Sequence, residues 1–460
     1  MNLATRWNPL YWQCACLCVN SGSYADELDD DYEADEDEGV SDEDPEEDSV
    51  KRNTAPKYGK ISRAIANAQH SGVTIELPDI NSAQSDFVPD VPNNAILYSL
   101  RAVNVISDAL LDSILVGRPY VSLSDFVVRV QPQRIQMVGL IKAGCFDALC
   151  KKPRGAILQE YLQSEADKDF PLKDKLTMVQ IRKALDLGWT RPEYADLIRM
   201  VRYKQYIDAR QNDPENKRYV LTEEKCLNFF YKWVEPSLNA SKNEYSVLPM
   251  GHVAIKASVF KRFWDKKIAP LVEYFNSEEG RLEYQKMQQT QFIQDFWNEK
   301  CAGTLATWEV ETMGFYHSPH ELIGVNKSKY NIIPFQQLDE HPDQNQISVL
   351  VGTVVDHDNT RHTVTLLTPE GVVDVKFWAE AYAKYNQRIS VVDPDTKKKH
   401  VIDESWFVRG AKIIVYGTRR ENMFRARRYF DGKRSHMVGL ITAIHNDGSI
   451  DARYSRASNT

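Results

Sequence analysis

Two pairs of closely spaced aspartates are the residues of this sequence that could most directly do chemistry. They are Asp356-x-Asp358 and Asp393-x-Asp395. Nucleotidyl transfer by two metal ions needs carboxylates that converge on paired Mg²⁺ ions. Both pairs fall in turns that we expect between strands, where Asp is common because its side chain supports the turn. No Walker loop, Gly-x-Ser-x-Gly elbow or His-Glu-x-x-His helix is present.

Two histidines and seven cysteines are the other candidates for metal ligands. His317 and His320 are three residues apart and could share a face. Pro319 lies between them and no third ligand is evident, so a structural linker is favoured over a metal site. The seven cysteines form no Cys-x-x-Cys pair, which argues against a zinc ribbon. We therefore expect reduced thiols, as in the cytosol, and neither a metal nor a cofactor in this chain.

Basic and aromatic residues are interleaved towards the end of the sequence. The rings are Phe377, Trp378, Tyr416, Phe424, Tyr429 and Phe430, and the cations are Lys376, Lys412, Arg419, Arg420, Arg425, Arg427 and Arg428. Proteins that hold single strands stack bases on aromatic rings and follow the phosphates with Lys or Arg. The cluster predicts a nucleic-acid-binding surface, although core packing will claim some of the rings.

The segment that carries this cluster has the pattern of a small β-barrel. Short strands parted by turns are expected at 348–355, 363–367, 372–377, 407–408 and 412–416, with a helix at 378–389 after the third strand. Three strands, a helix and two more strands match a five-stranded OB barrel. We place this domain at 346–435 and a tail at 436–460. Arg425, Arg427 and Arg428 then lie past the last strand and should face solvent.

The first two thirds of the sequence read as mainly helical, so the expected fold class is α+β. Residues 1–22 predict a buried helix, because apolar residues recur at helical spacing: Trp7, Leu10, Tyr11, Cys14, Leu17 and Cys18. Residues 58–90 should form a helix from Gly59 to His70 and then an extended stretch from Val73 to Leu77. Residues 94–150 should be helical, with stops near Gly117, Pro132 and Gly144. The stretch 151–310 looks almost wholly helical, and 311–345 is a linker. No run approaches the roughly 18 apolar residues of a membrane span.

The net charge of -8 hides a basic body with one acidic insert. Residues Asp26 to Asp48 carry 16 acidic side chains and no Lys or Arg, and the rest of the chain has 57 basic residues against 49 acidic ones. Like charges repel and apolar anchors are few, so we expect 23–57 to be disordered. A basic body suits a polyanionic partner, because Lys and Arg displace condensed counterions.

Five short motifs resemble, in this order, the C-terminal part of the DNA polymerase III α subunit, a replicative polymerase, in its phage-encoded form. They are Trp7-Asn-Pro-Leu-Tyr-Trp12, Tyr58-Gly-Lys-Ile-Ser-Arg-Ala-Ile65, Leu77-Pro-Asp-Ile-Asn-Ser82, Leu140-Ile-Lys-Ala-Gly-Cys-Phe-Asp-Ala-Leu149 and Gly314-Phe-Tyr-His-Ser-Pro-His320. The resemblance implies that 1–22 ends a fingers domain and that 58–150 is fingers and helix-hairpin-helix-like. It also implies that the catalytic Asp triad, with its Pro-Asp-x-Asp-x-Asp string, belongs to a palm that this chain lacks.

The resemblance also suggests where duplex DNA and a sliding clamp would bind. The expected Gly-x-Gly turn of the hairpin reads Asn104-Val-Ile-Ser107, without either glycine. Arg101, Arg118 and Arg129 could still contact phosphate as point charges. The clamp-binding peptide of the family is a Gln followed by apolar and aromatic residues, and 289–296 matches it poorly, so an ordinary helix is favoured there.

We therefore interpret the chain as the downstream part of a split phage polymerase. It would bind template and primer-template duplex in the bacterial cytoplasm, while a palm-bearing partner holds Mg²⁺ and adds nucleotides. A stand-alone OB-fold accessory protein that binds single strands is an alternative, and a Mg²⁺-dependent nuclease that uses an Asp pair is a second one. A neighbouring reading frame with the palm triad would favour the split polymerase.

Deleting Asp26 to Asp48 should leave the melting temperature nearly unchanged, because so charged a segment buries little apolar area. The same deletion should tighten DNA binding at low salt, since it removes 16 charges that repel phosphate. Calorimetry and a salt titration of DNA affinity measure the two effects. A fall of many degrees would show that the insert is part of the fold.

Overall fold

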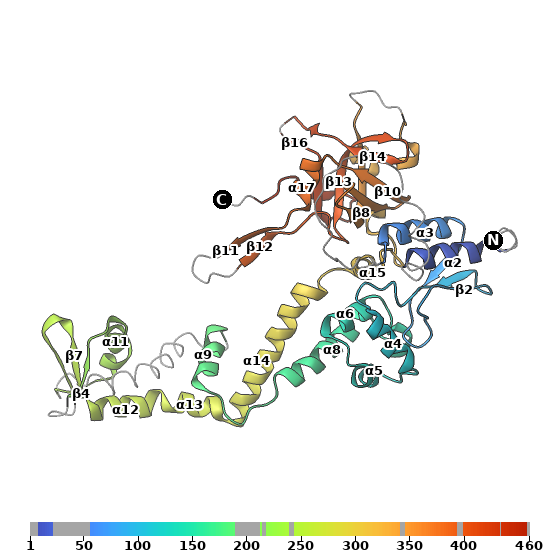
Figure 1. The fold of residues 1–460 in the computed structure, drawn as a ribbon. Coiled ribbons are helices and arrows are strands. Elements are labelled where there is room, and N and C mark those ends of the chain that lie inside the picture. Colours follow the sequence, from blue (N-terminus) through green and yellow to red (C-terminus); the bar gives the residue numbers. More distant parts are fainter. Residues whose placement is uncertain are drawn as a thin grey trace, which may run out of the picture. The chain divides into compact units, whose positions relative to one another are not determined.

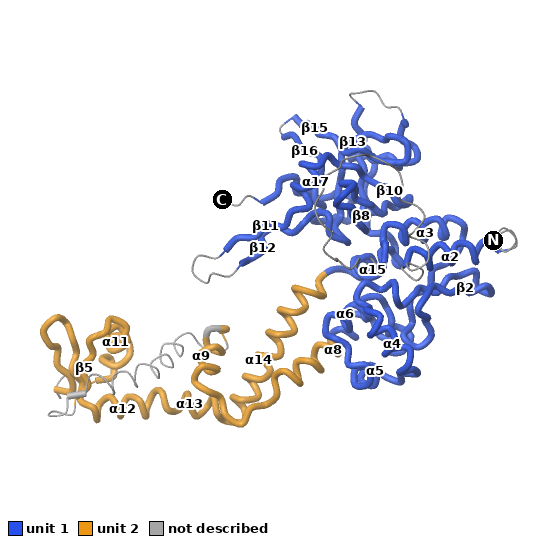
Figure 2. The backbone as a smooth tube through the Cα atoms, viewed as in Figure 1, with its two compact units in different colours: residues 1–158, 303–460 blue, residues 159–302 orange. Residues whose placement is uncertain are grey.

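The computed structural model describes residues 8–21, 56–188, 212–213, 218–238, 243–340, 346–392, 399–432 and 434–457. The chain divides into two compact units, residues 1–158 with 303–460 and residues 159–302 (Figure 2). The first unit thus combines the two ends of the sequence. The acidic segment 26–48, which we expected to be disordered, lies outside the described residues.

The first part of unit 1 consists of helices beside a small sheet (Figure 1). Its elements are α2 (Pro9–Asn20), α3 (Tyr58–His70), β1 (Thr74–Glu76), β2 (Val88–Asp90), β3 (Ala95–Leu97), α4 (Asp108–Val116), α5 (Leu123–Val130), α6 (Arg134–Lys142), α7 (Asp147–Cys150) and α8 (Arg154–Asp169), whose later part belongs to unit 2. The sheet has the order β1-β3-β2. Ser107 and Ser122 cap α4 and α5 by accepting hydrogen bonds from the backbone N–H groups of the first turn.

A short segment connects this part to the barrel. It comprises α15 (Leu305–Met313), a 3₁₀ turn (Glu321–Gly324), α16 (Lys327–Tyr330) and a second 3₁₀ turn (Phe335–Gln337). Gly314 ends α15 with φ +75°, and a Cβ there would lie 2.8 Å from the ring of Tyr58. Both the conformation and the close approach of α3 therefore require glycine at this position.

The rest of unit 1 is a barrel with attached strands. The elements are β8 (Ser348–Asp358), β9 (Thr363–Thr368), β10 (Gly371–Lys376), α17 (Ala379–Asn386), β11 (Ile389–Val392), β12 (Lys399–Asp403), β13 (Lys412–Arg420), β14 (Met423–Ala426), β15 (Tyr429–Phe430), β16 (Ser435–His436), β17 (Val438–Ile444) and β18 (Ile450–Arg453). The sheet runs β14-β10-β9-β8-β13-β17-β18, and β14 also pairs with β13. That pairing closes five strands into a barrel, with β10 and β14 parallel.

The barrel interior explains why apolar residues alternate with polar ones along the strands. Inward-facing residues include Val364 and Leu366 of β9, and Val373 and Val375 of β10. Four large rings fill the space between them, namely Phe377, Trp406, Phe407 and Phe424. The helical N-terminal part and the five-stranded barrel confirm the fold class expected from the sequence.

Three expectations about this barrel were wrong in detail. Phe407 and Val408 lie in a turn, so the fourth strand is β13 and the fifth is β14. Arg425 is consequently on a strand rather than beyond the last one. The expected tail 436–460 contains β17 and β18, because Val438 to Leu440 extend the sheet beside β13.

We expected residues 151–310 to be almost wholly helical, but unit 2 also contains a sheet. Its further helices are α9 (Met178–Asp186), α11 (Glu224–Phe229), α12 (Ala257–Lys267), α13 (Ala269–Asn276) and α14 (Glu278–Phe296), with π turns at Phe230–Val234 and Trp297–Cys301 and 3₁₀ turns at Glu235–Ser237 and Pro249–Gly251. A sheet of order β4-β5-β7-β6 accompanies them, made of β4 (Asn212–Asp213), β5 (Arg218–Leu221), β6 (Tyr245–Val247) and β7 (Val253–Lys256). These strands span two to four residues, too few for a period of two to stand out. Among the described helices, none is both long and apolar enough to cross a bilayer.

Replacing Gly417 with Ala should destabilise the barrel. Gly417 pairs with Ala426 where β13 meets β14, and a Cβ would lie 2.1 Å from the carbonyl oxygen of Arg425. The strands would have to separate, at a cost of about 1–3 kcal/mol. Gly324→Ala is the matched control, because nothing lies within 4 Å of a Cβ at that position. Calorimetry that finds both variants equally stable would contradict a tight closure between β13 and β14.

Candidate nucleic-acid interface

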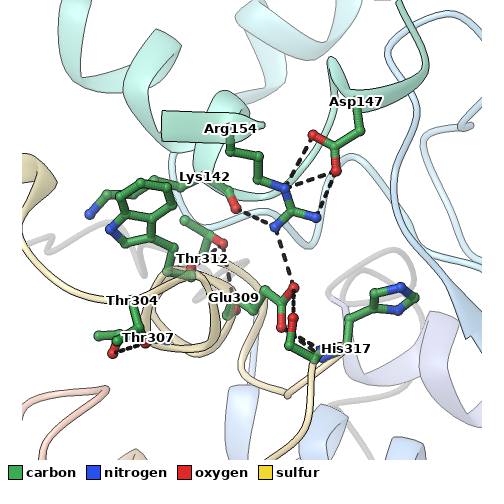
Figure 3. Close-up of polar contacts among 10 residues, drawn as sticks. Lys142, Asp147, Arg154, Thr304, Thr307, Glu309, Thr312 and His317 are labelled. Atoms are coloured by element: carbon green, nitrogen blue, oxygen red, sulfur yellow. Dashed lines mark hydrogen bonds and ion pairs between the residues drawn. The ribbon is translucent and has the colours of Figure 1, made fainter. Parts of the chain in front are cut away.

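A buried carboxylate fixes the loop that joins the helices of unit 1 to the barrel (Figure 3). Glu309 on α15 has no exposed surface. Its Oε2 accepts hydrogen bonds from the backbone N–H groups of His317 (3.0 Å) and Ser318 (2.7 Å), and its Oε1 accepts one from the Ser318 hydroxyl (3.0 Å). The loop 314–320 is therefore built around one side chain, which satisfies a charge that burial would otherwise penalise.

Arg154 connects this carboxylate to the preceding helices. Its Nη1 lies 3.4 Å from Oε1 of Glu309 and donates to the carbonyl of Lys142 (2.9 Å), while Nη2 lies 2.8 Å from Asp147 (Figure 3). A Cβ at Gly144 would lie 2.5 Å from Nη2 of Arg154. The glycine turn after α6 therefore approaches an internal guanidinium, and its backbone N–H groups bond within the same turn.

Of the two histidines of the loop, His320 makes structural hydrogen bonds and His317 is exposed. Nδ1 of His320 accepts a hydrogen bond from the Leu322 N–H (3.1 Å), so Nε2 carries the proton and donates to the carbonyl of Leu367 (3.1 Å). Burial lowers the pKa of His320 to about 4. His317 is exposed. Across the described residues no three His, Cys, Asp or Glu side chains gather in a way that could hold a metal ion, and the loop has the contacts of a linker.

The first aspartate pair, Asp356 and Asp358, accepts hydrogen bonds from backbone N–H groups. Oδ2 of Asp356 accepts from the Gly59 N–H (2.9 Å), and Oδ1 of Asp358 accepts from the N–H groups of Thr360 and Arg361 (both 2.8 Å). These contacts give Asp356 and Asp358 structural partners. Residues 393–398, with the second pair, lie outside the described residues.

Helix α3 covers the outer side of strands β8, β9 and β10. At Gly59 a Cβ would be 3.1 Å from Oγ1 of Thr365 and 3.2 Å from Asp356, so the helix backbone rests directly on the strands. Arg63 on the same helix pairs with Asp374 of β10 at 2.7 Å. The sheet face that OB barrels commonly offer to oligonucleotides is thus occupied here by another part of the same chain.

Several of the expected phosphate-binding cations have internal partners. Arg118 donates to the Ile80 carbonyl (2.7 Å), and burial lowers its pKa. Arg129 donates to the carbonyls of Gly117 and Pro119 and lies over the ring of Tyr120. Arg101 pairs with Asp108 at 2.5 Å. The Asn104 turn is itself held by a hydrogen bond from its N–H to the Thr312 carbonyl (2.9 Å).

Two cations of the barrel are also engaged internally. Nζ of Lys412 lies 2.9 Å from Glu321, and the Lys412 side chain is mostly covered. Arg419 donates to the carbonyls of Gln336 (3.0 Å) and Leu338 (3.1 Å) and pairs with Glu340 at 2.5 Å. Both side chains hold the linker against the barrel, so we leave them out of the binding surface.

Three of the remaining candidates, Lys376, Trp378 and Arg425, lie at the end of β10 and on its parallel neighbour β14. Lys376 and Arg425 are register partners on the parallel strands β10 and β14, and both point away from the interior. Trp378 is the second residue after β10 and is 70% exposed. Nζ of Lys376 donates to the carbonyl of Arg361, whose own side chain is 75% exposed. We call Arg361, Lys376, Trp378 and Arg425 the barrel patch.

The sequence analysis did not predict Arg361 as a nucleic-acid-binding residue. Its signal was its place in the loop between the first two strands, which OB barrels use for ligands. Of the other expected cations, Arg420 is half-buried at the end of β13, and Arg427 and Arg428 follow β14. Arg428 is exposed. Burial raises the pKa of Tyr385, and the positive charge of Arg428 partly offsets that rise.

Replacing Glu309 with Ala should destabilise unit 1 by about 3–5 kcal/mol, because it leaves two backbone N–H groups without their acceptor and removes one of the two carboxylates beside the buried Arg154. Glu340→Ala is the control, since it removes an exposed partner of Arg419 and should cost less than about 1 kcal/mol. Denaturant unfolding of both variants measures the difference in their free energies of unfolding. Equal stabilities would contradict a central role for the buried carboxylate.

Comparison with known proteins places these features. Residues 72–156 match the model of a helix-hairpin-helix motif. The chain is 32% identical over 480 residues to the probable DNA polymerase YorL of Bacillus subtilis and equally to a DNA-directed DNA polymerase of Bacillus phage SPbeta, over 99% of this chain and 34% of each relative. It is 34% identical over 99 residues to a DNA polymerase III subunit alpha of Caulobacter vibrioides, over 20% of this chain and 8% of the relative. The chain spans about a third of the length of the polymerases it matches most extensively. These matches show that it contains a region like that of the DNA polymerase III α subunit.

Proposed function

We propose that this chain binds the template strand and the primer-template duplex for a polymerase whose palm lies in another polypeptide or region. The observation that carries the proposal is the barrel patch. The exposed Trp378 comes two residues after Lys376, whose register partner Arg425 is also exposed. The side chain of Arg361, whose carbonyl binds Lys376, is 75% exposed. The similarity of nearly the whole chain to a DNA-directed DNA polymerase of a phage supports this assignment.

The barrel patch has the chemistry of a single-strand site. The indole of Trp378 can stack on a base of any sequence, because every base has a π-face. Lys376 and Arg425 lie on neighbouring strands, which are about 4.8 Å apart, so they can follow successive phosphates. Since α3 covers β8 to β10, the strand would run over the end of β10, the outer side of β14 and the loop at Arg361 rather than across the covered face.

Nucleotide addition would depend on the palm-bearing partner. No Pro-Asp-x-Asp-x-Asp string occurs in the sequence, so the two Mg²⁺ ions would be held by carboxylates of that partner. The assembly would work in the cytoplasm of the host. A sliding clamp is a weaker proposal: Gln289 is buried on α14, and its Nε2 donates to Asp167 (3.0 Å), so this glutamine is not presented as a free peptide.

A polymerase assay separates this function from that of an accessory protein. The chain alone should extend no primer, and it should support extension once the palm-bearing polypeptide of the same genome is added. Robust extension by the isolated chain would contradict the proposal. Binding of single strands with no effect on any palm-bearing polypeptide would favour the accessory protein.

Changes in the barrel patch should weaken single-strand binding without unfolding the barrel. Trp378→Ala should cost about 1–3 kcal/mol of binding free energy if the indole stacks on a base. Lys376→Glu with Arg425→Glu should lower the slope of log affinity against log salt by about 1.4, since each phosphate contact contributes about 0.7. Fluorescence anisotropy with a labelled oligonucleotide measures both quantities.

The matched control is Lys329→Glu with Arg388→Glu, which changes the net charge equally. Both residues are exposed, Lys329 on α16 and Arg388 after α17. The control should keep the salt slope of the wild type. A barrel-patch variant with unaltered affinity and slope, and an unaltered melting temperature, would rule this surface out as the path of the strand.

A further inference from the structure

Helix α2 is unusual because it has no charged residue. Its 12 residues, Pro-Leu-Tyr-Trp-Gln-Cys-Ala-Cys-Leu-Cys-Val-Asn, include no Asp, Glu, Lys or Arg. A helix on the surface of a globular protein normally carries charged or polar residues on its outer side, and one that is apolar all round is normally buried. The composition of α2 is therefore that of an enclosed helix.

Among the residues that the structure describes, contacts enclose one side of α2. Leu10, Cys14, Leu17 and Cys18 are buried, and α2 contacts α3, β2 and β3. The thiols of Cys14 and Cys18 both lie within 3.4 Å of the Phe87 carbonyl oxygen, which fixes the rotation of the helix.

The other side of α2 is apolar and open. A helix turns by about 100° per residue, so the outward residues Tyr11, Trp12, Ala15, Cys16 and Val19 share an arc of about 140°. Tyr11 is 48% exposed, Trp12 46% and Val19 51%. Tyr11 was expected to be buried, and it is not. We call these five residues the α2 strip.

The chemistry of the α2 strip excludes several occupants. Nucleic acid needs cations, and a helix that lies in a membrane interface carries Lys or Arg on its polar side; α2 has neither. The following segment, Asp26 to Asp48, carries 16 acidic residues and cannot cover an uncharged strip without desolvating them. An apolar protein surface is the remaining match.

We propose that the α2 strip is a docking surface for the palm-bearing polypeptide, an inference that rests on the proposed function. The relatives that match 99% of this chain are about three times longer, so roughly two thirds of their length has no counterpart here. In those relatives the equivalent helix is part of a larger protein, which supplies a surface that could enclose it. A 12-residue helix is only about 18 Å long, so a stable interface of about 800 Å² per partner must reach beyond it.

Binding to the palm-bearing polypeptide tests this surface. The probe is the polypeptide of the same genome that carries the Pro-Asp-x-Asp-x-Asp string, expressed as a separate chain. Trp12→Glu and Ala15→Glu place a charge on the α2 strip and should each weaken binding at least about tenfold, because aromatic anchors dominate interfaces. Val128→Glu on α5, at a residue that is 71% exposed, is the matched control and should bind as the wild type does.

Thiol labelling gives a second readout that does not depend on substitutions in the strip. Cys16 and Cys150 are the two half-buried thiols, and the other cysteines are buried. The probe should slow alkylation of Cys16 and leave alkylation of Cys150 unchanged. DNA affinity and melting temperature of the α2 variants should match those of the wild type, which separates lost docking from lost folding.

Five results would overturn the proposal. Wild-type affinity of both charged variants for the probe would exclude the α2 strip while leaving the proposed function intact. If the wild-type chain bound DNA but did not bind the probe, the palm-bearing polypeptide would be excluded as the partner of the α2 strip. Failure of both DNA and probe binding would count against the proposed function itself, as would a genome without the string. A wild-type dimer in sedimentation that Trp12→Glu makes monomeric would assign the strip to a second copy.

Discussion

The buried carboxylate of Glu309 is the interaction on which the arrangement of unit 1 depends. An isolated charge in the interior is costly, and this one is tolerated because backbone N–H groups, a hydroxyl and Arg154 surround it. Those donors come from the loop 314–320 and from the helices before it. From the same loop, the Tyr316 hydroxyl lies 2.8 Å from Oγ1 of Thr353 in β8. One side chain therefore ties the motif of residues 72–156 to the barrel.

This connection determines which surfaces can bind nucleic acid. The hydroxyl of Ser62 on α3 donates to the carbonyl of Gly314 (2.5 Å), so the loop also holds α3 where it covers the strands. Covering β8 to β10 removes the usual OB face, whereas Arg425 on the outer side of β14 stays exposed. The helical part of unit 1 and the barrel thus contact each other through α3 and through the loop 314–320.

The sequence predicted the barrel well because its strands alternate on a period of two and contain many β-branched residues. It took Phe407 and Val408 for a strand, although Phe407 fills the barrel interior from a turn. It predicted the first part of β13, at 412–416, and missed β14, which has only four residues. It could not separate Arg419 from Arg425, which are six residues apart. The partners of Arg419 are carbonyls about 80 positions earlier in the chain, and no local pattern reports such contacts.

The interpretation of α2 shows the same limit from the other side. Its composition predicted burial, and in this chain only the arc with Leu10 and Leu17 is buried. Composition reflects every surface that a helix meets in its working assembly, whereas the fold of one chain shows only the contacts within it. The same reasoning applies to charge: Arg425 is exposed, whereas Phe424 and Ala426 on either side of it in β14 are apolar and buried. A residue type that its own fold does not explain, whether apolar and open or charged and unused, is the feature from which a binding surface is most directly inferred.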